Sequence, residues 1–116
     1  MLARLARWLF WPALLFAFVM AILPHPPRIP GDPADKVQHM AAFATLTLLA
    51  GLGYPRIRPL VLVAALAAFG ALIEIVQSIP ALHRSCDIMD WLADMVAVLV
   101  MLAIVLALRR LRPATR

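Results

Sequence analysis

The sequence contains a single cysteine, Cys86, among its 116 residues. No disulfide can therefore form within the chain, and a cysteine-rich zinc site is excluded. Acidic residues are also few, with six Asp and Glu against eleven Lys and Arg. Neither the alternating polarity of strands nor a repeat of roughly 20 to 50 residues is present, which argues against a β-barrel and against a repeat array.

Apolar residues, in contrast, make up 65% of the chain, and its mean hydropathy is +0.93. They form apolar runs at 8–23, 39–54, 60–79 and 91–108. A helix of about 20 residues crosses a hydrocarbon core of about 30 Å. We therefore expect a single all-α membrane domain, a compact bundle of four transmembrane helices over about 8–23, 33–54, 60–79 and 87–108.

The net charge of +5 is distributed unevenly along the chain. The segments that would lie on one side of a four-pass protein carry Arg4, Arg7, Arg56, Arg58, Arg109, Arg110, Arg112 and Arg116. All six acids lie elsewhere. The positive-inside rule therefore predicts cytoplasmic termini. The basic excess would then face the anionic inner leaflet, and no nucleic-acid partner is expected.

The first helix is expected to be retained, because no cleavage site of small residues precedes the proline-rich stretch 24–33. Pro12 is expected near the start of that helix, where a missing backbone donor costs little. The stretch 24–33 is predicted to be an external loop. Asp32 and Pro33 are typical of an N-cap followed by proline, so the second helix should begin there.

Ionisable and amide side chains interrupt the third and fourth apolar runs. Glu74 and Gln77 lie three residues apart and share one helix face, and Asp87, Asp90 and Asp94 share a face of the next helix. Such side chains inside a transmembrane segment are costly and normally face the bundle interior. They are therefore candidate functional residues.

A second polar group lies at the outer end of the second helix. Asp35, Lys36 and His39 occur there, and Lys36, His39 and Phe43 recur on one face. For His39 a functional role and a structural hydrogen bond both remain open. Antiparallel folding would bring these residues to the same surface as Glu74, Arg84 and the aspartates. The sequence thus predicts a shallow polar pocket that opens outward.

These residues resemble the motifs of the VanZ-like family of small membrane proteins. The resemblance rests on DKVQH at 35–39, E-x-x-Q at 74–77 and R-x-x-D-x-x-D at 84–90, and it covers about 35–98. It implies a four-helix protein of the bacterial inner membrane, related to a founding member associated with tolerance to teicoplanin. Two positions depart from the family: Asp94 replaces a usual Asn, and Ala97 replaces a usual Gly.

Several roles remain open for the pocket. The polar groups could form a structural network in which Asp32 and Asp87 cap helices. Our first functional hypothesis is binding of membrane lipids or of a lipid-linked cell-wall precursor. Its expected ligand-binding residues are Asp35, Lys36, Gln77, Arg84, Asp87, Asp90 and Asp94.

The second hypothesis is an intramembrane enzyme with His39 and Glu74 as catalytic acid or base. No cofactor is required by the sequence. A divalent metal would have His39 and Glu74 as candidate ligands, although no H-E-x-x-H signature occurs. The third hypothesis, a proton or cation path, is opposed by the absence of acids from the inner half.

Overall fold

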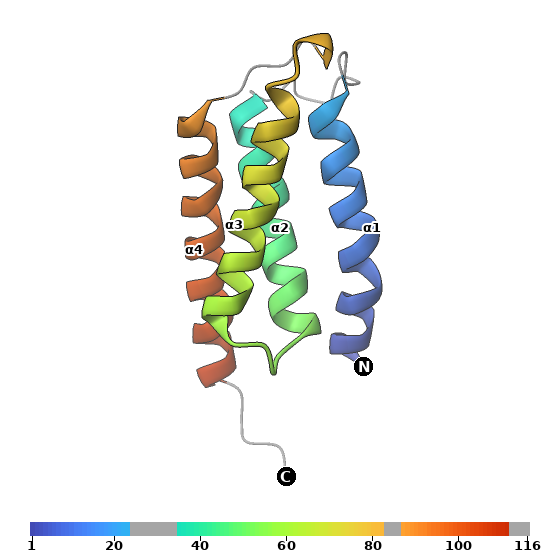
Figure 1. The fold of residues 1–116 in the computed structure, drawn as a ribbon. Helices are drawn as coiled ribbons and strands as arrows, with labels where there is room; N and C mark the ends of the chain where they lie inside the picture. The colour runs from blue at the N-terminus through green and yellow to red at the C-terminus, as the bar shows by residue number, and fades with distance from the viewer. Residues whose placement is uncertain (24–34, 83–86, 112–116) are drawn as a thin grey trace.

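The computed structural model describes residues 1–23, 35–82 and 87–111, without the side chains of residues 35 and 82. This part of the chain forms four long helices and one short 3-10 helix, which run up and down in alternation (Figure 1). Their bounds are Leu2–Ile22 for α1, Asp35–Gly53 for α2, Pro59–Gln77 for α3, Pro80–Leu82 for η1 and Ile88–Leu111 for α4. The start of α1 and the end of α4 lie at the same end of the bundle (Figure 1).

The helix α1 begins at Leu2, six residues before the predicted start. The apolar pattern does not predict these six residues because Arg4 and Arg7 interrupt the apolar run, although long basic side chains are compatible with a helix. The prediction that Pro12 lies near the start of α1 is therefore wrong. Pro12 lies inside the helix, where it offers no N–H to the carbonyl one turn earlier. The predicted cap at Asp32 and Pro33 lies outside the described residues.

Three helices, α1, α3 and α4, are long and apolar enough to cross a membrane. They also carry almost all the large apolar side chains that the described residues expose; on α2 only Val37 does so. α2 is less apolar because its first turn contains Lys36 and His39. It packs against both α1 and α4. These are the features of a helical membrane protein whose least apolar helix is shielded by its neighbours.

The core lies along the inner face of α2. Phe43 and Leu46 are 2% and 1% exposed, and Val98 of α4 is completely buried against this cluster. The ring of Phe43 packs at a tilt on Phe69 of α3, with 5.8 Å between ring centroids. Thr47 is also fully buried, but its hydroxyl donates to the Phe43 carbonyl at 2.7 Å, so it leaves no polar group unsatisfied.

Close helix contacts at the end of α2 depend on glycine. A Cβ on Gly53 would lie 2.9 Å from the backbone nitrogen of Arg7, and one on Gly51 would lie 3.0 Å from Val105 Cγ1. Small residues allow helices to approach closely in a membrane, where apolar burial alone does not drive their association. The two glycines therefore set the distance of α2 from α1 on one side and from α4 on the other.

Two arginines complete the same end of α2. The Arg7 guanidinium donates to the Gly53 carbonyl at 3.1 Å, and Arg109 of α4 donates to the Gly51 carbonyl. The last carbonyls of a helix lack partners within it and carry partial negative charge. The sequence identifies these arginines only as signals of membrane topology. The structure adds that they cap α2 and connect it to both neighbouring helices.

Candidate functional site

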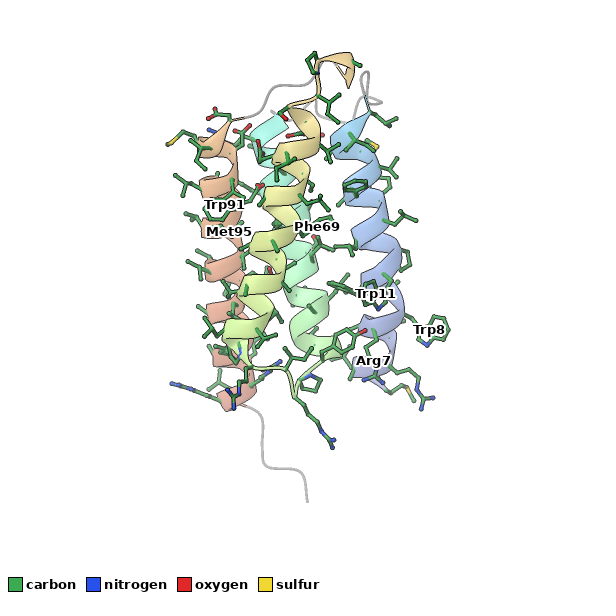
Figure 2. All side chains as sticks on the ribbon, in the orientation of Figure 1. Arg7, Trp8, Trp11, Phe69, Trp91 and Met95 are labelled. Carbon is green, nitrogen blue, oxygen red and sulfur yellow. The ribbon has the colours of Figure 1, made fainter. Side chains whose placement is uncertain are left out.

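The polar candidates gather at the end of the bundle where α2 and α4 begin and α3 ends, here called the polar end. Oxygen-bearing side chains concentrate there, whereas nitrogen-bearing side chains concentrate at the opposite end (Figure 2). The described arginines at that opposite end, here called the arginine end, are Arg4, Arg7, Arg56, Arg58, Arg109 and Arg110. The described arginines and acids thus lie at opposite ends of the bundle, and Lys36 is the one described Lys or Arg at the polar end.

Glu74 is the central acid of the polar end. Its side chain is 7% exposed, and its Oε2 accepts a hydrogen bond from the backbone N–H of Asp87 at 3.0 Å. Oε1 is buried and has no hydrogen-bond partner among the described residues. Burial of an acceptor without a partner costs roughly 1–3 kcal/mol, and more if it is charged. This oxygen is therefore a point where a bound donor or cation would stabilise the protein.

Asp87 begins α4. Its Oδ1 accepts a hydrogen bond from the backbone N–H of Met89 at 2.9 Å, as an N-cap side chain does. The expectation that Asp87 caps a helix is confirmed. Because its backbone N–H also binds Glu74, this residue joins the end of α3 to the start of α4. Its side chain is exposed and remains accessible to a ligand.

Gln77 has a partner on the first helix. It is 2% exposed, and its Nε2 donates to the Ala21 carbonyl at 2.9 Å. Ala21 lies in the last turn of α1, where the backbone carbonyls have no N–H partner within the helix. Gln77 thus joins α3 to the end of α1. Gln77, a predicted ligand-binding residue, therefore has a structural role in joining these two helices.

Lys36 and Asp90 connect the first turns of α2 and α4. Their Nζ and Oδ1 atoms are 3.7 Å apart, and their side chains are 50% and 20% exposed. An ion pair with this exposure contributes about 0–1 kcal/mol to stability. The Lys36 ammonium is held at the surface of the polar end, so a negatively charged ligand could reach it.

Asp94 and His39 lie deeper on the same two helices. Asp94 is 2% exposed, one turn below Asp90, and His39 is half-buried on α2. Both residues have interaction partners in the structure. The three aspartates become more buried with depth: Asp87 is exposed, Asp90 is partly buried and Asp94 is buried.

Aromatic side chains border the polar end on the side that faces the middle of the bundle. Trp91 donates from Nε1 to the Ala67 carbonyl of α3 at 3.1 Å. A Cβ on Gly70 would lie 3.1 Å from Trp91 Cδ1 and 3.3 Å from Phe43 Cζ, so glycine is needed where these rings meet α3. The sequence alone does not predict this role of Trp91. The one sequence signal for it is Gly70, which lies one turn before Glu74 on the same helix face.

Some candidates lie outside what the structure describes. This applies to Arg84 and to the side chain of Asp35, although the backbone of Asp35 begins α2. Within residues 1–23, 35–82 and 87–111, no three His, Cys, Asp or Glu side chains lie close enough together to hold a metal ion. His39 and Glu74, the candidate metal ligands, are therefore not part of such a group among the described residues.

The polar end as a whole contains a buried carboxylate oxygen of Glu74, the surface ammonium of Lys36 and the three aspartates Asp87, Asp90 and Asp94. Hydrogen bonds and one ion pair join all four helices there. The arrangement could bind a ligand that combines hydrogen-bond donors with a negative charge. Comparisons of the chain with protein-family models, with curated proteins and with solved structures find no match.

Proposed function

We propose that the chain crosses a bacterial inner membrane four times, with both termini in the cytoplasm and the polar end on the outer side. The start of α1 and the end of α4 share one end of the bundle, as four passes require. The described arginines share that end, which the positive-inside rule assigns to the cytoplasm. α2 would be the fourth span, with its polar first turn at the outer interface and its sides covered by α1 and α4.

A reporter that is active only in the cytoplasm, fused to the C-terminus, is expected to be active in cells. A periplasm-type reporter at the same position should be silent, because the arginine end resists translocation. The same pair of reporters after Tyr54, in the connection between α2 and α3, should give the same result. Activity of the periplasm-type reporter at both positions would invert the topology and turn the polar end inward.

For the polar end, we propose binding of an envelope lipid or of a lipid-linked cell-wall precursor. The observation that carries this proposal is the buried Oε1 of Glu74, which has no partner among the described residues. Sugar hydroxyls or amides of such a ligand would donate to this oxygen. The half-exposed Lys36 ammonium would meet the phosphate. The resemblance to the VanZ-like family agrees with this proposal and extends it to tolerance of teicoplanin.

Replacement of Lys36 by glutamine is expected to weaken precursor binding about tenfold, because a charge-assisted hydrogen bond to phosphate is lost. Asp90→Asn is the matched variant, since it breaks the same ion pair but keeps the cation. It should tighten binding by removing the competing carboxylate. The measurement is a titration of the purified protein in detergent with a polyprenyl-pyrophosphate-linked disaccharide precursor. Equal weakening in both variants would show that the ion pair, and not the cation, matters.

The alternative is an intramembrane enzyme that acts on such a lipid. This alternative also depends on Oε1 of Glu74. A buried carboxylate with one unused acceptor could serve as a general base, and His39, half-buried on α2, could be its acid partner. Turnover of the precursor by the purified protein would favour this alternative over binding alone.

A further inference from the structure

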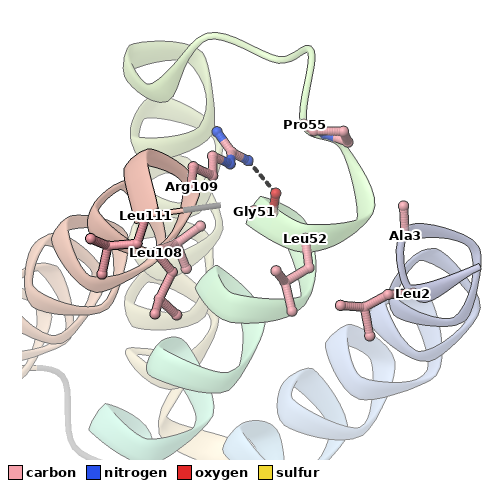
Figure 3. A pocket seen from close by; sticks show the side chains of 9 residues that line it. Leu2, Ala3, Gly51, Leu52, Pro55, Leu108, Arg109 and Leu111 are labelled. Carbon is pink, nitrogen blue, oxygen red and sulfur yellow. Dashed lines mark hydrogen bonds between the residues drawn. The ribbon is translucent and has the colours of Figure 1, made fainter. Parts of the chain in front are cut away.

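At the arginine end, the structure contains a cavity that the proposed function does not use (Figure 3). Its volume is about 480 Å³, within the range of roughly 300–1,000 Å³ that is common for small-molecule sites. The walls come from the start of α1, the end of α2 and the end of α4. They are formed by Leu2, Ala3, Gly51, Leu52, Pro55, Val105, Leu108, Arg109 and Leu111.

The cavity forms because α1 and α4 both pack on α2 and leave a space between them at this end. Gly51 lines the space without a side chain, and Leu2 and Leu108 at its edge are 49% and 51% exposed. If the bundle spans a membrane as proposed, this space opens to the inner leaflet. An apolar cavity in that position is filled by lipid rather than by water.

Arg109 supplies the polar part of the cavity. Its guanidinium reaches across to the Gly51 carbonyl, so the side chain is held in the wall (Figure 3). That bond uses one of the five N–H groups of a guanidinium, whose geometry suits a phosphate. No acid of the described residues lies at this end; Glu74, Asp87, Asp90 and Asp94 are all at the polar end. The local charge is therefore positive.

We propose that this cavity binds one anionic phospholipid of the inner leaflet, with its phosphate on Arg109 and an acyl chain against Leu52, Leu108 and Leu111. The apolar wall and the fixed cation match the two halves of such a molecule. This inference rests on the proposed orientation in the membrane. It concerns a different end of the bundle from the precursor site, so each can fail without the other.

The test is native mass spectrometry of the delipidated protein in detergent, titrated with phosphatidylglycerol or with phosphatidylcholine of the same acyl chains. Phosphatidylglycerol should bind more tightly at the first site. Arg109→Gln should weaken phosphatidylglycerol binding about tenfold, which corresponds to loss of one charge-assisted hydrogen bond. Arg110→Gln is the matched control, because Arg110 is exposed, follows Arg109 directly and does not line this cavity. It should change the affinity by at most about threefold.

A third variant covers the case in which Arg109→Gln does not fold. Ala3→Phe fills the cavity from α1 and keeps the guanidinium, so it should weaken binding of both lipids. Equal affinity for the two lipids, equal effects of Arg109→Gln and Arg110→Gln, or unchanged binding in Ala3→Phe would each overturn the proposal. A dimer that excludes lipid would also overturn it, because a second copy would then occupy the cavity.

Discussion

Replacement of Phe43 by alanine is expected to lower the free energy of unfolding by about 3–5 kcal/mol. Phe43 is 2% exposed and packs on Phe69, and its ring also lies next to Gly70. Removal of the ring leaves a cavity between α2 and α3 that neighbouring side chains can fill only in part. The loss is of packing contacts, which stabilise helix association inside a membrane as they do in a soluble core.

The matched control is Phe16→Ala on α1, which removes the same side chain from a position that is 65% exposed. This phenylalanine faces outward, so its loss should change stability by less than about 0.5 kcal/mol. Both variants would be compared with the unmodified protein by thermal unfolding in detergent, followed by circular dichroism. Similar shifts for the two variants would mean that Phe43 is not in the core and that the rotation of α2 is wrong.

Replacement of Glu74 by glutamine is expected to separate the structural role of this residue from its functional role. The amide oxygen of glutamine can still accept the N–H of Asp87, and burial of a neutral amide costs less than burial of a carboxylate. The unfolding free energy should therefore stay unchanged or rise by about 1–2 kcal/mol. Glu74→Met, which removes the acceptor, should lose this advantage.

The functional effect of Glu74→Gln discriminates between the two proposals for the polar end. If the protein binds the precursor without reaction, the variant should weaken binding about tenfold, because the amide oxygen stays on the Asp87 N–H and the amide NH2 group, a donor, replaces the acceptor Oε1. A general base cannot be replaced by an amide, so an enzyme should lose at least about 100-fold in turnover. Precursor binding and product formation would be measured on the same preparations. Unchanged binding, with no turnover in the unmodified protein, would contradict both expectations.

The sequence by itself determined the helices and the ends at which charges gather. Long apolar runs separated by prolines and glycines predict helices of membrane-spanning length, and three of them have that length and composition in the structure. A chain that reverses direction after each helix must bring the start of α2, the end of α3 and the start of α4 to one end. The convergence of Lys36, Glu74 and Asp90 follows from that. The cap at Asp87 was also predictable, because capping depends on adjacent backbone groups.

Only the tertiary structure decided how the helices surround one another and which polar groups meet. The short connection between α2 and α3 favours direct packing, yet α2 packs mainly on α1 and α4. The bonds from Gln77 to Ala21 and from Arg109 to Gly51 join residues 56 and 58 positions apart. No local pattern predicts them. In a soluble protein the polar face of each helix would indicate its rotation, but here apolar residues cover the lipid-facing and core-facing sides alike. Helix order and rotation are then set by the fit of small and large side chains, such as Gly53 against Arg7, which only the folded chain brings together.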